Sequence, residues 1–248
     1  MCHDTDSAPP KLSESGSVAS EELLELTSAD GTSFTVFHTE PGQPLGRSLV
    51  VFPDRRGVHQ YYLELARRFA EAGFSVAVLD YYGRTAGPGP RGDDFDWAPN
   101  FRQLVPDNVS ADAAAVVEFL RRRHPDDDVY SVGFCLGGGH SWRLSSVVAG
   151  LNGCVGFYGL PSLAAERVTE ISAPLLLLLA GDDVATTAEQ FDDFRRQLDE
   201  AGKPYEHKVY EGAPHSFFDG GNPEWSEISA DAWRRVLDFT DRYASTVA

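Results

Sequence analysis

Apolar residues follow two alternating patterns along this chain: short continuous runs and longer segments with helical spacing. The continuous runs lie at 48–54, 74–82, 128–135, 153–159 and 173–181. Runs of this kind are typical of strands that are buried on both faces. The segments with helical spacing lie at 61–74, 108–124, 138–150, 186–202 and 222–243. Their alternation predicts an α/β fold, with a mostly parallel central sheet and helices on both faces.

Further strand signals lie at the two ends of this pattern. Residues 22–39 contain two extended runs around the turn signal ADGT, which predicts a hairpin. Residues 205–212 predict a last strand before the closing helix. Residues 1–20 are rich in Ser, Pro and acidic side chains, so we predict a disordered N-terminal arm. No linker interrupts the pattern after that, and residues 21–248 are predicted to form a single domain.

The composition restricts the possible partners. The 248 residues are 42% hydrophobic and 24% charged, as expected for one large α/β domain. A formal net charge of -17 opposes binding to nucleic acid and to anionic membranes, so we expect a small-molecule partner. The longest apolar run, 175–180, is too short to cross a bilayer. Three cysteines without regular spacing argue against a disulfide framework and favour a cytoplasmic protein.

The sequence contains no motif for a metal or a cofactor. Its cysteines and histidines lack paired zinc spacing. The glycines at 137–139 are not followed by the Lys-Ser/Thr of a phosphate loop, and they do not form G-x-G-x-x-G. We therefore expect no cofactor and no metal, in a chain that acts as a monomer or a homodimer.

The segment GFCLG is the strongest chemical signal in the chain. Gly133 and Gly137 flank Cys135 at the end of a predicted strand, in the pattern of a nucleophile elbow that holds cysteine instead of serine. Glycine relieves the crowding where strand and helix meet. The N–H groups at the start of the next helix point at the sulfur and favour thiolate over thiol. The alternative is a buried structural cysteine, since free Cys also packs as a small hydrophobe.

Two other loops favour the chemical interpretation. Asp182 and Asp183 directly follow the strand 173–181, where a carboxylate can accept a hydrogen bond from an imidazole and fix its tautomer. His215 follows the last predicted strand, ahead of the closing helix. The order nucleophile, acid, histidine is that of α/β-hydrolases. Since ligands bind beyond the carboxyl ends of parallel strands, these loops are predicted to form one site. Spacing alone leaves both aspartates open.

The chain resembles the dienelactone hydrolase family of α/β-hydrolases, whose hallmark is a cysteine nucleophile in GFCLGG. The similar segments are VVFPDRRGV, FSVAVLDYYGRTAG, GFCLGGG, VGFYG, LLAGDDVATT and YEGAPHSFF. The resemblance covers nearly all of 21–248 and implies an α/β-hydrolase fold. It implies Cys135 as nucleophile, His215 as base and Asp183, rather than Asp182, as the acid. The implied reaction is hydrolysis of a small ester or lactone through an acyl-cysteine intermediate.

The resemblance also implies roles for residues around the cysteine. The family has a glutamate after its first parallel strand that contacts the resting cysteine, and Asp54 stands at that position. The implied oxyanion donors are the backbone N–H groups of Arg55 and Leu136. Tyr158 matches a tyrosine that the family often places near the active site, although as sequence alone it is equally a packed aromatic.

Substrate recognition is where the chain departs from the family pattern. The family holds a substrate carboxylate with two arginines, and the resemblance implies Arg84 as the first. The second position, four residues after the histidine, holds Asp219, which would repel an anion. Arg55, Arg56 and Arg91 are nearby cations, but arginines in polar loops are usually solvated. The alternative function is a non-hydrolytic member that binds or rearranges a small carbonyl compound.

Overall fold

The computed structural model describes residues 7–11, 16–92 and 94–245. Its strands form one sheet in the order β1-β2-β4-β3-β5-β6-β7-β8. They are β1 (Val18–Thr27), β2 (Ser33–Pro41), β3 (Arg47–Phe52), β4 (Phe74–Leu79), β5 (Asp128–Phe134), β6 (Gly153–Phe157), β7 (Leu175–Asp182) and β8 (Tyr205–Pro214). The hairpin β1–β2 pairs antiparallel with β4, and all pairs from β4 to β8 are parallel. The predicted, mostly parallel sheet is confirmed.

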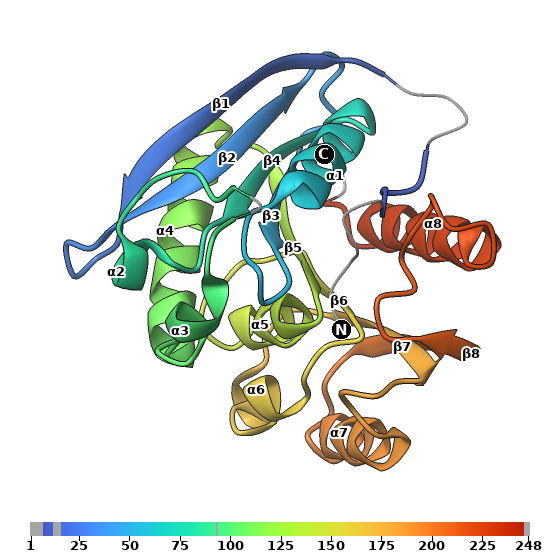
Figure 1. Ribbon diagram of the computed structural model, residues 1–248. Coiled ribbons are helices and arrows are strands. Elements are labelled where there is room, and N and C mark those ends of the chain that lie inside the picture. Colours follow the sequence, from blue (N-terminus) through green and yellow to red (C-terminus); the bar gives the residue numbers. More distant parts are fainter. Residues whose placement is uncertain (1–6, 12–15, 93, 246–248) are drawn as a thin grey trace.

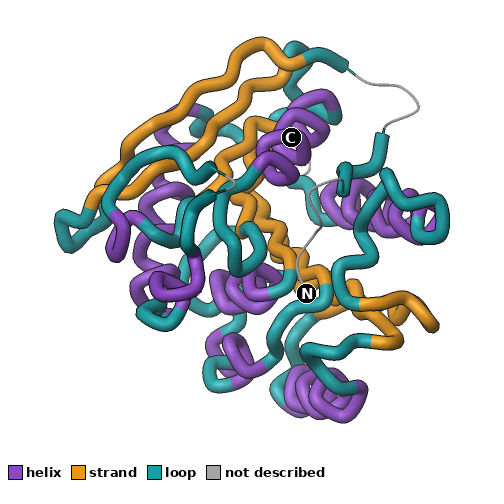
Figure 2. Tube along the Cα trace, in the orientation of Figure 1, coloured by secondary structure: helices purple, strands orange, loops and turns teal. Residues whose placement is uncertain are grey.

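The helices cover both faces of this sheet (Figures 1 and 2). They are α1 (Gln60–Glu71), α2 (Gly83–Ala86), α3 (Trp97–Phe101), α4 (Pro106–Arg123), α5 (Leu136–Leu144), α6 (Ser162–Ala165), α7 (Ala188–Glu200) and α8 (Ser226–Arg242), with a 3-10 turn at Val168–Glu170. The side chains of α1 and α8 pack in one apolar cluster, and those of α4, α5 and α7 pack in the other.

Alternate residues of each central strand point to opposite faces of the sheet and so belong to different clusters. In β4, Val76 and Val78 belong to the cluster under α1 and α8, whereas Ala77 and Leu79 belong to the opposite one. A strand inside a doubly covered sheet needs apolar residues on both faces, which explains the continuous apolar runs in the sequence. The sheet therefore holds the loops at its carboxyl ends on a rigid, packed base.

The N-terminal segment differs from the prediction of a disordered arm over residues 1–20. Residues 1–6 and 12–15 lie outside the described residues. Within the remainder, β1 already begins at Val18. The N–H of Ala8 donates to Asp219 Oδ1 (3.0 Å), and the carbonyl of Ala8 accepts from the Gly220 N–H (2.8 Å). Pro9 and Pro10 are buried. Composition did not reveal these contacts because their partners lie more than two hundred residues away.

The segment between β4 and α4 contains two short helices, α2 and then α3. None of the helices in the described ranges is long and apolar enough to span a membrane.

Candidate active site

Cys135 stands in the sharp turn between β5 and α5. Its backbone has φ 56° and ψ -118°, a conformation that side-chain-bearing residues rarely adopt. A Cβ on Gly133 would lie 1.9 Å from the Gly137 carbonyl oxygen, and a Cβ on Gly137 would lie 2.2 Å from that of Phe52. Both glycines are therefore required by close backbone contacts, as the sequence predicts. The loop that leaves β3 is pressed directly against the elbow.

The surroundings of the two described cysteines differ. Cys135 is 9% exposed, and its N–H donates to the Phe157 carbonyl (3.0 Å) at the N-terminus of α5. Cys154 lies inside β6 and is fully buried, and burial raises the pKa of its thiol to about 12. Cys154 is thus a core residue. Cys135 is the thiol at the open end of the sheet.

His215 and Asp183 form a buried pair at the same edge. His215 Nδ1 lies 2.9 Å and 3.0 Å from the two carboxylate oxygens of Asp183, and both side chains are 1% exposed. The same carboxylate accepts from the N–H groups of Ala185 (2.7 Å) and Thr186 (3.1 Å). Asp182 is exposed at the end of β7. Of the two aspartates that the spacing left open, only Asp183 contacts the histidine within the described structure.

The other nitrogen of His215 is available for chemistry. Nε2 is buried and has no hydrogen-bond partner among the described residues. The ring packs against Tyr158, with centroids 4.8 Å apart, and Tyr158 directly follows the Phe157 that binds the Cys135 backbone. Tyr158 has φ 38° and is fully buried, so it is fixed between the elbow and the histidine. The structure therefore places Tyr158 at the site, as the resemblance implies.

Asp54 is held in place by residues of its own loop. Its side chain is 1% exposed and lies 3.8 Å from the Arg56 guanidinium and 3.3 Å from His59 Nε2. The Arg56 N–H donates to Asp54 Oδ1 at 2.8 Å. Sequence reasoning missed His59, although its position directly before α1, five residues after Asp54, is the kind of spacing that brings a loop back on itself.

A buried tyrosine lies near both Asp54 and Cys135. The Tyr81 hydroxyl donates to the Pro53 carbonyl at 2.7 Å. Burial raises the pKa of Tyr81 well above its usual range, and negative charge on Tyr82, Asp54 and Cys135 adds to this effect. Tyr81 therefore stays neutral and serves as a fixed donor that braces the β3 loop.

The two backbone N–H groups that the resemblance singled out are both free in the described structure. Leu136 is the first residue of α5, so its N–H has no intrahelical acceptor, and no other described residue accepts from it. The Arg55 N–H likewise has no acceptor among the described residues. Both belong to the two segments that meet at Gly137, the elbow and the β3 loop.

The structure does not support the predicted substrate-binding role of Arg84. Its guanidinium donates to Asp112 in α4 (2.6 Å) and to Asp30 in the β1–β2 turn (2.5 Å). Further donors reach Thr32 (3.0 Å) and Ser28 (3.3 Å). These hydrogen bonds, that to Asp112 first, raise the pKa of Arg84 further above its usual value. Arg84 therefore ties the hairpin to α4, a long-range role that the local motif did not reveal.

In the described ranges 7–11, 16–92 and 94–245, no group of three or more His, Cys, Asp or Glu side chains is arranged to hold a metal ion. His140, close to the elbow, is buried against Phe52 and Tyr81, at centroid distances of 6.3 Å and 5.9 Å. Burial lowers its pKa to about 3, so its ring is a neutral packing element.

Comparison with protein-family models gives a match over residues 34–244, to the model described as "Dienelactone hydrolase family". The chain belongs to the dienelactone hydrolase family. The resemblance to this family and the α/β-hydrolase fold, both predicted from the sequence, are confirmed. The predicted class of enzyme, a hydrolase of esters or lactones, is confirmed as well. The match begins at the second residue of β2 and covers all strands after β1. It includes the elbow, the aspartate loop and the histidine loop.

Relatives of this family align along most of the chain. A carboxymethylenebutenolidase of Rhodococcus opacus is 28% identical, with 98% of this chain and 97% of the relative covered. A putative carboxymethylenebutenolidase of Escherichia coli (strain K12) is 27% identical, with 87% and 84% covered. The chain is therefore similar to these dienelactone hydrolase family members over nearly their full length.

Solved structures show the same fold. A putative dienelactone hydrolase from Klebsiella pneumoniae subsp. pneumoniae MGH 78578 matches with a TM-score of 0.75 and 24% identity, over 90% of this chain and all of the other. A dienelactone hydrolase-like promiscuous phosphotriesterase from metagenomic libraries matches with a TM-score of 0.76 and 21% identity, over 93% and all of the other. At these identities the likeness concerns the fold alone.

Proposed function

We propose that this chain hydrolyses a small ester or lactone through a covalent acyl-cysteine intermediate on Cys135. The observation that carries the proposal is the buried His215–Asp183 pair at the strand ends, with Nε2 of His215 left without a partner in the described structure. An imidazole oriented by a carboxylate and unbonded at its other nitrogen is suited to remove a proton from a nucleophile. Cys135, at the elbow on the same edge of the sheet, is the nucleophile in this proposal.

In the first half of the reaction, His215 takes the proton of the Cys135 thiol and Asp183 stabilises the resulting imidazolium. The thiolate attacks the carbonyl carbon, and the negative charge moves to the carbonyl oxygen. The N–H groups of Leu136 and Arg55 are the donors for that oxygen, and such a donor is typically worth about 3 kcal/mol in the transition state. The C–O bond then breaks, and the alkoxide takes the proton from His215.

In the second half, His215 accepts a proton from a water molecule, which attacks the thioester carbonyl. The C–S bond breaks, the acid is released, and the proton returns to the sulfur. Asp54 lies in the loop pressed against the elbow, and its fixed carboxylate modulates the resting thiol. For a lactone, the alkoxide of the first half stays attached to the acyl group, so one hydroxy acid is the product.

The setting that we propose is the cytoplasm, with a soluble small molecule as substrate and a monomer or homodimer as the active form. The three cysteines of the chain have no regular spacing, which agrees with a reducing compartment. A free thiol as nucleophile also works best where it is kept reduced.

The test is the hydrolysis of p-nitrophenyl acetate and of a small lactone panel by the wild type and by Cys135→Ala. We expect kcat/KM to fall by a factor of about 10³ or more, because the covalent route is removed. Cys154→Ala is the matched control, since it removes a thiol from β6 and is expected to keep the activity. Intact mass measured within the first turnovers should show an acetyl adduct that Cys135→Ala lacks.

Retention of full activity by Cys135→Ala would refute the proposal. Rapid alkylation of Cys135 by iodoacetamide below pH 8, without turnover of any ester or lactone, would favour the non-hydrolytic alternative.

A further inference from the structure

Arg55 is unusual among the arginines of this acidic chain. In the described ranges, every arginine except Arg55 and Arg102 has a hydrogen bond or an ion pair with an oxygen or nitrogen of the protein. Arg102 is exposed at the end of α3. Arg55 is partly buried, and its Nε is buried without a hydrogen-bond partner in the described structure.

Trp97 holds the Arg55 guanidinium in position. The guanidinium carbon lies 4.9 Å from the Trp97 ring centroid, within the range of a cation–π contact. Trp97 in turn packs edge-on against Phe101 (6.2 Å), so α3 provides a fixed aromatic support. On the backbone side, the Arg55 carbonyl accepts from the Tyr82 hydroxyl. The side chain is therefore fixed without any carboxylate to neutralise it.

Arg91, a few residues before Trp97, shows the contrast. Its guanidinium also lies over an aromatic ring, 4.8 Å from the centroid of Phe95. Arg91, however, donates to the buried Asp80 at 2.8 Å and to the Gly87 carbonyl. Stacking on an aromatic ring thus accompanies a buried carboxylate partner at Arg91 but not at Arg55.

Asp54, the neighbour of Arg55 in the chain, and Asp219, in the loop of His215, are both engaged by other groups. Asp54 is bound by Arg56 and His59. Asp219, the acid in the histidine loop, accepts from the N–H groups of Ala8 and Gly221. Among the described residues no carboxylate lies within 4 Å of the Arg55 guanidinium. A partly buried cation without a counter-ion is unfavourable, and a bound anion would complete it.

The geometry points to Arg55 as a specificity residue that selects an anionic group, a carboxylate in the first instance, on the molecule that reacts at Cys135. This inference rests on the proposed function for the location of the reacting carbonyl. The Arg55 backbone contributes to the same loop that is pressed against the elbow, so its side chain starts beside the reacting centre. A guanidinium presents parallel N–H donors to a carboxylate, and the indole of Trp97 keeps them oriented.

The test compares two alkylating reagents that differ only in charge. Iodoacetate transfers a carboxymethyl group to the Cys135 thiolate, and iodoacetamide transfers a carbamidomethyl group. In both reactions the C–S bond forms as iodide leaves. The rate constants for the peptide that contains Cys135 are measured by mass spectrometry, in the wild type, Arg55→Gln and Arg102→Gln. We expect the iodoacetate-to-iodoacetamide ratio to fall about tenfold in Arg55→Gln, because one charge-assisted contact is lost.

Arg102→Gln is the matched control, since it removes the same charge from an exposed arginine at the end of α3, the helix that carries Trp97. Equal iodoacetate-to-iodoacetamide ratios in the wild type and Arg55→Gln would overturn the inference. An equal fall of the ratio in Arg55→Gln and Arg102→Gln would also overturn it, because it would indicate an effect of the net charge of the protein. Failure of either reagent to reach Cys135 would also overturn it. Raising the salt concentration is expected to lower the ratio in the wild type and to leave it nearly constant in Arg55→Gln.

Ester substrates supply an independent readout. The ratio of kcat/KM for p-nitrophenyl hemisuccinate over its neutral methyl ester is expected to fall in Arg55→Gln, mainly through KM, and to fall partly in Arg55→Lys, which keeps the charge but loses the planar fork. Loss of hydrolysis in Cys135→Ala, with an unchanged ratio in Arg55→Gln, would refute the role of Arg55 and leave the proposed function intact. A lower alkylation ratio in Arg55→Gln, without hydrolysis of any ester or lactone by the wild type, would support the role of Arg55 and refute the proposed function.

Discussion

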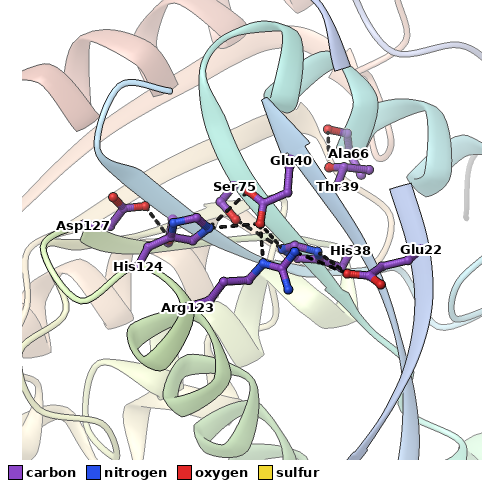
Figure 3. A network of polar contacts seen from close by, with 10 residues as sticks. Glu22, His38, Thr39, Glu40, Ala66, Ser75, Arg123, His124 and Asp127 are labelled. Atoms are coloured by element: carbon purple, nitrogen blue, oxygen red, sulfur yellow. Dashed lines mark hydrogen bonds and ion pairs between the residues drawn. The ribbon is translucent and has the colours of Figure 1, made fainter. Parts of the chain in front are cut away.

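Two buried histidines of this protein lie beside carboxylates, yet their surroundings differ. His215 follows β8 in a loop and has one carboxylate, Asp183, at 2.9 Å from Nδ1. His38 lies in the middle of β2, with Glu22 3.5 Å from Nδ1 and Glu40 3.5 Å from Nε2 (Figure 3). Burial lowers the pKa of His38, and the two glutamates oppose that shift only in part.

The difference lies in what surrounds each ring. The backbone of His38 pairs with Glu22 of β1 on one side and with β4 on the other, and its ring packs edge-on against Phe119 at 5.2 Å. Glu40 is shared with Arg123 and His124 (Figure 3). Nδ1 of His38 and Nε2 of His215 both lack a hydrogen-bond partner in the described structure, but His38 lies between two paired strands whereas His215 directly follows β8 in a loop. A histidine beside a carboxylate is therefore a candidate base where strands end, because the loops there can bring a nucleophile to its second nitrogen.

The largest expected effect separates these two histidines by activity. His215→Gln is expected to lower kcat/KM for p-nitrophenyl acetate by a factor of about 10³, since the general base is removed. His38→Gln is expected to change it by less than about twofold while lowering the melting temperature, because its partners are structural. Equal losses of activity in the two variants, measured well below both melting temperatures, would contradict the distinction.

A third buried histidine sharpens the comparison through pH. His140 has a pKa of about 3, because of burial and then the charge of Arg143. The unfolded chain binds a proton near pH 6.5 but the folded chain does not, so stability falls as the pH drops below 6.5 towards 3. At about 1.4 kcal/mol per pH unit, this amounts to about 2 kcal/mol at pH 5. Urea unfolding at pH 7.5 and pH 5 measures it.

In His140→Phe this contribution is absent, so the loss of stability between the two pH values should shrink by about 2 kcal/mol. His38 acts in the same direction, because its pKa is also lowered, and its effect is expected to be smaller, since Glu22 and Glu40 favour the charged ring. An identical pH dependence in the wild type and His140→Phe would show that the ring is not kept neutral.

The smallest expected effect concerns the loop that carries His215. Asp219 accepts the Ala8 N–H at 3.0 Å, and Asp219→Asn weakens this contact by removing the charge. We expect a loss of about 1 kcal/mol, or about 2–4 °C in melting temperature for a chain of this size. Asp182→Asn, at an exposed position, is the matched control and should leave the melting temperature unchanged. Equal shifts in both variants would indicate a general effect of net charge.

The sequence predicted those parts of the site that depend on local chain geometry. Gly133 and Gly137 are required by backbone contacts within the elbow, and such contacts leave a readable trace in the sequence. The order of the three loops follows from the alternation of strands and helices. The sequence could not decide between Asp182 and Asp183, because the direction of each side chain depends on the residue at which the strand ends. The hydrogen bond from His215 distinguishes them in the structure.

The arginines show why the remainder could not be predicted. The family resemblance implies Arg84 as a substrate contact, but its guanidinium donates to Asp30 and Asp112 from other elements. In a chain of net charge -17, nearly every arginine finds an acid, and which acid it finds is set by the packed fold. Arg55, in the loop next to the elbow, has no such partner among the described residues. It can be identified only when the partners of the other arginines are known from the structure.

The backbone of Cys135, at φ 56° and ψ -118°, has a consequence for the history of this protein. A conformation of this kind costs on the order of 1–3 kcal/mol for any residue other than glycine. Cys135→Gly should therefore give a molecule that melts at a higher temperature and catalyses nothing. Selection for heat resistance alone would replace the thiol, so a cysteine kept at this cost in stability agrees with the proposed role of Cys135 as nucleophile.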